Sequence, residues 1–253
     1  MAISKNRFVR RINPLFLKGV CHRGLHNHQF TENGLLAFKN ARDHHMAFEL
    51  DVHLTRDNQL IVCHDENLKR TTGKDGIIED MDVRTIKENY RLLDGEEVPT
   101  LQEVLEANKE EVPIIIEMKV FRKNYEPLSR RLLEELKVIR DKKNIILISF
   151  DPRSLTRCRH SGFVRQLLVS DDKQYRWIFH LKRLFEGIDI DQARVRERQV
   201  RRYGKHHMVN YWTIETIGEL DKILPYGNMV TFQHADPDEV RNRMTVKNMA
   251  FLD

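Results

Sequence analysis

Short apolar runs recur along the chain, most of them followed by a segment with helical spacing, and this alternation limits the possible folds more than any other feature. The runs are rich in Ile, Val and Leu, which is typical of strands buried on both faces of a parallel sheet. Eight such runs occur, at 15–22, 46–54, 60–65, 113–119, 144–150, 164–170, 207–213 and 228–233. Eight strands with helices between them in 253 residues predict an α/β fold, a closed (β/α)8 TIM barrel. A doubly wound open sheet is the alternative, because counting strands cannot prove closure.

The predicted helices carry start signals. Thr31 leads the segment TENGLLAFKNARDHH, and Thr100 has Glu103 at the spacing of a capping box. Asp151 and Asp236 are each followed by proline, which places Asp at the N-cap and Pro at the first helical position. We therefore expect a helix to begin at each of these four places.

One connection is longer than a simple barrel requires. The segment from Glu66 to Pro99 separates a strand end from the next capped helix, whereas βα loops usually have about 2–6 residues. We expect one TIM-barrel domain over 1–253, with a small insertion at approximately 66–99 after the third strand. A basic segment at 1–14 precedes the barrel; it is either a solvated tail or a region attracted to an anionic membrane surface.

Composition narrows the class of protein. The chain is 40% hydrophobic, which is ample for a core, and no stretch approaches the 18 consecutive apolar residues of a membrane-spanning helix. Cys21, Cys63 and Cys158 make no plausible disulfide framework, so we expect buried thiols in a reducing compartment and a cytoplasmic protein. The net charge is +5, but basic residues are mixed with acids and no aromatic platform accompanies them, which disfavours nucleic-acid binding.

Ionisable residues collect where the first four predicted strands end. In a barrel the carboxyl ends of the strands converge on one mouth, where catalytic residues are expected. Each side chain alone has an ordinary structural explanation, but the coincidence of four strand ends favours a functional site. The residues concerned are His22, Arg23, Glu49, Asp51, His64, Glu117 and Lys119.

Three of these residues are acids that would repel one another. Glu49 and Asp51 are two apart on the second predicted strand and so share a face, and Glu117 lies at the end of the fourth. Like charges about 4 Å apart repel by about 4 kcal/mol at an effective dielectric of 20, and a divalent cation relieves that repulsion. Oxygen-only ligands without cysteine favour Mg²⁺ or Ca²⁺.

The remaining four residues suit a phosphate ester. Lys119 and the metal can neutralise nonbridging oxygens, and the guanidinium of Arg23 can bind two oxygens at once. His22 and His64 can exchange protons near neutral pH, one with the nucleophile and the other with the leaving oxygen. The set predicts metal-assisted hydrolysis of a phosphodiester. Which histidine is the acid, and whether water or a neighbouring hydroxyl attacks, stays open.

In this order the residues resemble the glycerophosphodiester phosphodiesterase family. The resemblance rests on CHRG, TENGLLAF, FELDVHLTRDNQLIVCHDENLKRTTG, VPTLQEVL and IIIEMK, and more loosely on ISFD and VNYWT, and it extends from His22 to Thr213. Two positions depart from the family pattern. Gly34 replaces the Thr of a P-E-N-T element, and Thr231-Phe232 stands where the family usually has Thr-Asp.

The resemblance implies a TIM barrel that hydrolyses glycerophosphodiesters to sn-glycerol 3-phosphate and an alcohol. The resemblance also implies that His22 and His64 are the general acid and base. It implies that Glu49, Asp51 and Glu117 hold one divalent metal. Arg23 and Lys119 bind the phosphate. Trp212 matches an aromatic residue on the glycerol side of the site, and the insertion matches a substrate-covering element.

Two other functions remain as alternatives. The segment 171–187 has amphipathic spacing with basic residues, which would suit a membrane-associated lysophospholipase D, although a crossover helix in a barrel is amphipathic anyway. A non-catalytic phosphoester-binding barrel is the other, and the retention of both histidines argues against it. The sequence does not indicate the oligomeric state or the headgroup of the substrate.

Overall fold

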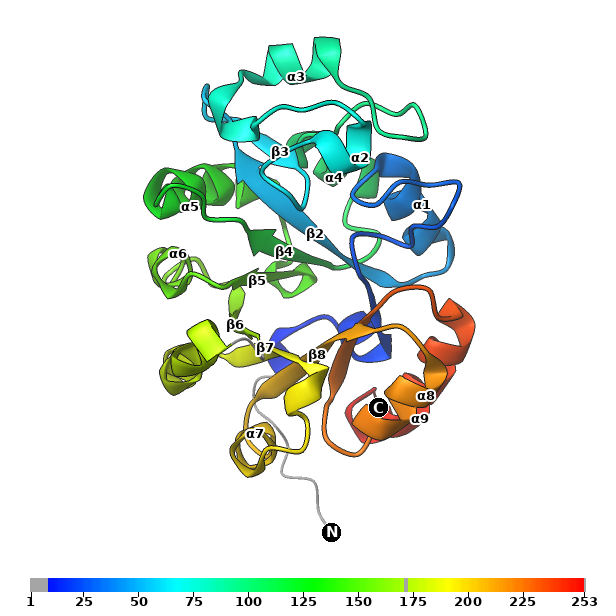
Figure 1. Cartoon of the computed structure of the whole chain (residues 1–253). Helices are drawn as coiled ribbons and strands as arrows, with labels where there is room; N and C mark the ends of the chain where they lie inside the picture. Colours follow the sequence, from blue (N-terminus) through cyan, green and yellow to red (C-terminus); the bar gives the residue numbers. More distant parts are fainter. Residues whose placement is uncertain (1–8, 171–172, 253) are drawn as a thin grey trace.

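The computed structural model describes residues 9–170 and 173–252, in which eight parallel strands form a barrel surrounded by helices (Figure 1). The barrel strands are β1 (Val20–Cys21), β2 (Ala47–Leu54), β4 (Ile114–Met118), β5 (Ile145–Ser149), β6 (Val164–Val169), β7 (Gly187–Asp191), β8 (Met208–Ile214) and β9 (Met229–Phe232). β1 pairs in parallel with both β2 and β9, which closes the sheet. The predicted TIM barrel is therefore confirmed, and the open sheet is excluded.

The helices are α1 (Leu35–Asp43), α2 (Lys69–Thr72), α3 (Val83–Asn89), α4 (Leu101–Asn108), α5 (Tyr125–Glu135), α6 (Pro152–Arg157), α7 (Arg198–Gly204), α8 (Ile217–Ile223) and α9 (Pro237–Leu252). Three predicted starts are confirmed. Thr100 forms a capping box with Glu103, and Asp151 and Asp236 each accept a backbone N–H of the first turn. The fourth is wrong: α1 begins only after Gly34, because Thr31 instead exchanges hydrogen bonds with Asp94.

The predicted third barrel strand, 60–65, is not part of the barrel. Its ordered part, β3 (Leu60–Val62), pairs antiparallel with β2. The five residues from Thr55 to Gln59 form a tight turn closed by hydrogen bonds between these two residues, and so short a connection can join only antiparallel strands. The predicted place of this strand in the parallel barrel is therefore wrong, and the segment inserted after β2 begins earlier than expected.

The apolar runs do not reveal one of the eight barrel strands, β7. Its sequence, GIDID, has only two apolar side chains, Ile188 and Ile190, alternating with two acids. Asp189 is nevertheless buried and accepts a hydrogen bond from the side-chain amide of Asn210 on β8, at 2.9 Å. A search for continuous apolar runs overlooks a strand that buries a polar side chain in this way.

The inserted segment between β2 and α4 forms a small layer of its own at one side of the barrel, at the top of Figure 1. It contains β3, α2, α3 and the 3₁₀ helix η3 (Ile78–Asp80). A separate apolar cluster holds it together: Ile61, Cys63, Leu68, Ile78, Ile86, Tyr90, Leu92 and Val98. The insertion therefore has a packed core and can present side chains from α2 to the barrel mouth.

Two predicted surface segments differ from expectation. The amphipathic segment after β6 forms a 3₁₀ helix, η6 (Lys173–Leu184), in which Phe179 is buried; the side chains at 173–178 lie outside the described residues. The basic segment 1–14 is only partly described. Its end is partly packed, since Ile12 is 2% exposed and Asn13 bonds to Asn144, whereas the basic Arg10 and Arg11 are exposed. No helix in the described ranges is both long and apolar enough to span a bilayer.

The alternation of side chains along the strands places the acids inside the barrel mouth. Ala47 and Ile115 belong to an apolar cluster together with Ile146, Val164 and Met208. Glu49 and Asp51 follow Ala47 on the same face of β2, and Glu117 follows Ile115 on the same face of β4. One face therefore changes from apolar at the amino ends of the strands to acidic at their carboxyl ends.

Candidate active site

The three predicted carboxylates converge. Asp51 on β2 lies opposite Glu117 on β4 in the sheet register, and one oxygen each of Glu49, Asp51 and Glu117 lies within 4.8 Å of the other two. All three residues are buried, with 3%, 1% and 7% of their surfaces exposed. Three buried acids that share so small a space form a donor set that could hold a divalent cation.

The electrostatics of these acids show why a cation suits the site. Burial, together with the charges of Asp51 and Glu117, raises the pKa of Glu49 well above its usual range. Burial also raises the pKa of Glu117, to about 7, although Lys119 opposes the shift. The ammonium of Lys119 lies 3.1 Å from Asp51 and 2.8 Å from Glu117, so it partly neutralises the pair. It leaves Glu49 without an ammonium partner among the described side chains.

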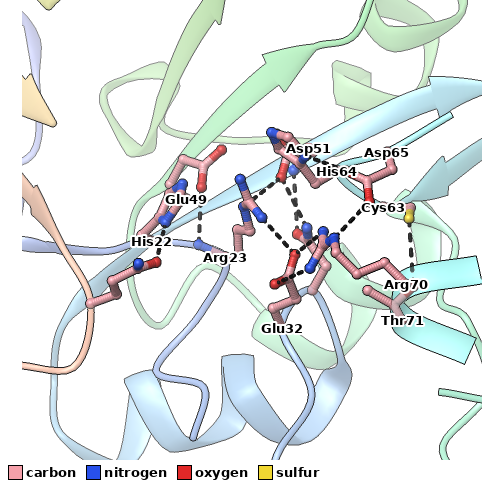
Figure 2. Close-up of polar contacts among 12 residues, drawn as sticks. His22, Arg23, Glu32, Glu49, Asp51, Cys63, His64, Asp65, Arg70 and Thr71 are labelled. Carbon is pink, nitrogen blue, oxygen red and sulfur yellow. Dashed lines mark hydrogen bonds and ion pairs between the residues drawn. The ribbon is translucent and has the colours of Figure 1, made fainter. Parts of the chain in front are cut away.

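Arg23 is held by backbone and side-chain contacts (Figure 2). Its φ is 54°, which turns its backbone N–H towards Glu49 Oε2 at 3.0 Å. The guanidinium donates from Nη1 to Glu32 Oε1 at 2.7 Å, and Nε lies 3.6 Å from Asp51 Oδ2. Asn33 donates to the same Asp51 oxygen at 2.9 Å. The side chain of Arg23 therefore lies beside the acidic cluster and is hydrogen-bonded to the carboxylate of Glu32 at its edge.

We expect Gly24→Ala to destabilise the turn after His22 and Arg23. Gly24 has φ +81°, and an added Cβ would lie 2.9 Å from the carbonyl carbon of Ala37 in α1. Gly73 is a matched control, with φ +75° and no atom within 4 Å of an added Cβ. Gly73→Ala should cost about 1–2 kcal/mol for backbone strain alone, and Gly24→Ala about 1–3 kcal/mol more for overpacking. Urea unfolding measures both, and equal losses would contradict this account.

The hydrogen bond of His22 fixes which ring nitrogen carries the proton. Gln233 donates from Nε2 to Glu215 at 2.8 Å, which leaves its Oε1 to accept from His22 Nδ1 at 2.7 Å. Nε2 of His22 is then the nitrogen with a free lone pair. Burial, reinforced by the charge of Arg23, lowers the pKa of His22 to about 4. His22 is therefore neutral at pH 7, with a basic nitrogen available.

His64 has a carboxylate partner instead. Its Nδ1 donates to Asp65 Oδ1 at 2.6 Å, and its backbone carbonyl lies 3.2 Å from Nε2 of the buried His53. Burial lowers the pKa of His64, and the charges of Lys119 and Arg23 act in the same direction, whereas Asp51 and Asp65 oppose them. The carboxylate of Asp65 orients the ring and favours its protonated form.

A cleft of about 840 Å³ opens beside the acids and is lined by His64, Glu117, Lys119, Phe121 and Phe150 among others. Trp212, on β8, packs edge-on against Phe150 with ring centroids 6.2 Å apart. Its indole N–H is buried and has no hydrogen-bond partner within the described ranges. Trp212 itself is not among the residues that line the cleft, so the structure leaves its hydrogen-bonding capacity unused without placing it at the cleft wall.

The sequence did not single out several residues that orient this site: Glu32, Asn33, Asp65, Arg70 and Gln233. Glu32 and Asn33 lie in the TENG segment, and Asp65 directly follows His64, so their positions were a usable signal. Gln233 gave none, because it lies 211 residues from His22 along the chain. Arg70 is close in sequence to Asp65, but its second partner, Glu32, is 38 residues away, and no local pattern indicates that contact. Ser149, which lines the cleft, has a structural contact, since it donates to the carbonyl of Met118.

A closed TIM barrel with three converging acids, two imidazoles and two cations at its mouth has the arrangement expected of a barrel that handles phosphoesters. The sequence matches the glycerophosphoryl diester phosphodiesterase family over residues 22–214. This match covers most of the chain, and the chain therefore belongs to that family.

Several relatives are similar to this chain. The protein YqiK of Bacillus subtilis is 32% identical over 61% of the chain and 67% of its own length. A glycerophosphodiester phosphodiesterase of Caldanaerobacter subterraneus is 33% identical over 54% of the chain and 59% of its own length. A human lysophospholipase D is 34% identical over 44% of the chain and 39% of its own length. The match thus covers about 40% to two thirds of the length of these relatives.

Solved structures agree with the fold. A glycerophosphodiester phosphodiesterase of Thermotoga maritima is 27% identical, with a TM-score of 0.71, and the alignment covers 90% of this chain and 97% of that one. A phosphodiesterase of Oleispira antarctica, solved in complex with the product sn-glycerol-3-phosphate, has a TM-score of 0.78 at 23% identity, over 89% and 95% of the two chains. The second likeness concerns the fold alone.

Proposed function

We propose that this protein hydrolyses glycerophosphodiesters to sn-glycerol 3-phosphate and an alcohol, in a reaction that depends on one divalent cation. The observation that carries the proposal is the convergence of Glu49, Asp51 and Glu117 within 4.8 Å, beside the two imidazoles and two cations at the barrel mouth. Family membership supports the same class of reaction.

The donor set fits a hard cation. Glu49, Asp51 and Glu117 would hold Mg²⁺ or Ca²⁺ through oxygen atoms. Burial, together with repulsion among the acids that such an ion relieves, raises the pKa of Glu49 and Glu117. When bound, the ion supplies positive charge that stabilises the phosphate oxygens in the transition state. Arg23 and Lys119 would bind the remaining phosphate oxygens, and the unpaired indole N–H of Trp212 would donate to the glycerol portion.

The hydrogen bonds support different roles for the two histidines. His22 keeps its proton on Nδ1, facing Gln233, so Nε2 would accept the proton of the nucleophile as general base. His64 faces Asp65, whose carboxylate stabilises the imidazolium, so its Nε2 would give a proton to the leaving oxygen. The bound phosphate would raise the pKa of His64 by its negative charge and so load the acid. The nucleophile is water or the free hydroxyl next to the phosphate in the glycerol.

A substrate panel tests the proposal. Glycerophosphocholine, glycerophosphoethanolamine and lysophosphatidylcholine are incubated with Mg²⁺ or Ca²⁺, and glycerol 3-phosphate and free alcohol are measured. Turnover of the first two is the expected result. Cleavage of lysophosphatidylcholine alone would favour the lysophospholipase D activity named for the human relative. Binding of all three without any product would show a non-catalytic barrel and contradict the proposal.

Metal affinity is expected to rise with pH across neutrality. Because the pKa of Glu117 is raised to about 7, the metal-free protein keeps a proton on this group at pH 6, and the cation must displace it. Titration calorimetry with Mn²⁺ in two buffers of different ionisation enthalpy should detect more proton release at pH 6 than at pH 8.5. Glu117→Gln should bind more weakly and release fewer protons at pH 6. Equal proton release by this variant and the wild type would contradict the role of Glu117.

A further inference from the structure

Arg70, which belongs to the insertion, connects the partner of His64 with the partner of Arg23. It lies on α2, and its Nε donates to Asp65 Oδ2 at 2.6 Å. Its Nη1 and Nη2 donate to the two oxygens of Glu32, at 2.7 and 2.8 Å. One guanidinium thus contacts two carboxylates that come from different parts of the chain (Figure 2).

Each of these carboxylates has a second partner in the site. The other oxygen of Asp65 accepts from Nδ1 of His64 at 2.6 Å, and Glu32 Oε1 also accepts from Nη1 of Arg23 at 2.7 Å. A continuous chain of hydrogen bonds therefore runs from His64 through Asp65, Arg70 and Glu32 to Arg23. The side chain of Arg70 is 46% exposed, whereas those of Glu32 and Arg23 are 15% exposed, so Arg70 closes the network from the solvent side.

We propose that Arg70 is a positioning residue that fixes His64 and Arg23 relative to each other, through Asp65 and Glu32. Through this contact the insertion would orient both the proton donor and the phosphate-binding guanidinium. The proposal rests on the proposed function for its effect on turnover, but not for its effect on the ring of His64. Arg70 itself need not touch the substrate.

The geometry requires a planar, forked donor at this position. A guanidinium can contact both oxygens of Glu32 and still present Nε to Asp65, whereas an ammonium acts as a compact point charge. Arg70→Lys would therefore keep the charge but lose the simultaneous contact with both carboxylates. If only the positive charge matters, this variant should behave as the wild type does.

The experiment compares Arg70→Gln and Arg70→Lys with Lys69→Gln. Lys69 is the neighbouring residue on α2, its side chain is 65% exposed, and it pairs only with Asp75 among the described ionised groups, so its replacement makes the same charge change away from the site. We expect kcat for glycerophosphocholine to fall about 10- to 100-fold in Arg70→Gln and at least about 5-fold in Arg70→Lys. In a His64→Ala background, the further loss of kcat caused by Arg70→Gln should shrink to a few-fold, because Arg70 can then act only through Glu32 and Arg23.

Two readouts do not need turnover. Long-range ¹H–¹⁵N spectra of the histidine rings should show His64 with its proton on Nδ1 in the wild type and in Lys69→Gln, and a mixture of both ring tautomers in Arg70→Gln. The affinity for glycerol 3-phosphate, measured by calorimetry with the metal present, should weaken about 3- to 10-fold in Arg70→Gln because Arg23 is no longer held. Melting temperatures record any general loss of stability.

The outcomes separate this proposal from the proposed function. If the wild type hydrolyses no diester, the proposed function fails, and the tautomer of His64 still decides whether Arg70 positions it. A His64 tautomer in Arg70→Gln that matches the wild type would overturn the positioning role. So would full activity of Arg70→Lys, or a kcat for Arg70→Gln equal to that of Lys69→Gln.

Discussion

Replacing His22 with alanine is expected to lower kcat for glycerophosphodiesters by about 10²- to 10⁴-fold, with a much smaller effect on the affinity for glycerol 3-phosphate. The proton of His22 lies on Nδ1, facing Gln233, so the ring offers its Nε2 to accept the proton of the nucleophile. Steady-state kinetics on glycerophosphocholine with saturating Mg²⁺ provide the measurement. His206→Ala, at an exposed histidine beyond α7, is the control that should leave kcat unchanged.

A second substrate distinguishes the two histidines. A diester whose leaving group departs without protonation does not need a general acid, so His64→Ala should recover most of its loss on such a substrate, whereas His22→Ala should not. Recovery by His22→Ala alone would reverse the assigned roles. Retention of more than about a tenth of the wild-type kcat by His22→Ala on the natural diester would contradict its role as base.

Replacing Glu49 with glutamine is expected to abolish metal-dependent activity without destabilising the metal-free protein. Glutamine keeps an oxygen to accept the backbone N–H of Arg23 and cannot carry the negative charge that burial and the neighbouring acids disfavour at this position. The melting temperature of the metal-free variant should equal or exceed that of the metal-free wild type. The wild type should gain about 2.7 kcal/mol at a metal concentration one hundred times its Kd, and the variant should gain much less.

Glu66→Gln is the matched control for this change. Glu66 also lines the cleft but is exposed, and it lies outside the acidic cluster. Calorimetric melting with and without Mg²⁺ or Ca²⁺ measures both variants. A Glu49→Gln protein that keeps the full metal-dependent gain, or a Glu66→Gln protein that loses it, would contradict the proposed ligand set.

The barrel was predictable because most of its strands are apolar runs with clear helix signals between them. The predicted number of barrel strands was right although two assignments were wrong. β3 was counted as a barrel strand, and β7 was missed. The turn from Thr55 to Gln59 could have revealed the first error, because five residues cannot form a parallel crossover. The second needed tertiary information, since Asp189 is stabilised inside the fold by Asn210, a residue of the next barrel strand.

The acidic cluster was predictable from spacing, because Glu49 and Asp51 must share a face and Glu117 follows on a neighbouring barrel strand. The contacts that orient the histidines were not. Gln233 lies 211 residues from His22, and no local pattern indicates which polar residue after β9 will reach it. Gln233 directly follows the Thr231-Phe232 pair, which departs from the family pattern. Its hydrogen bond to His22 is therefore a polar contact that this end of the barrel supplies to the site.

The central claim is that one divalent cation binds among Glu49, Asp51 and Glu117. Anomalous diffraction from a crystal soaked in Mn²⁺ and glycerol 3-phosphate tests it most directly. The account predicts a single strong anomalous peak within about 2.5 Å of an oxygen of each acid, with phosphate oxygens on its open side. A peak bound elsewhere, or a phosphate held at the barrel mouth with no metal beside these acids, would contradict it.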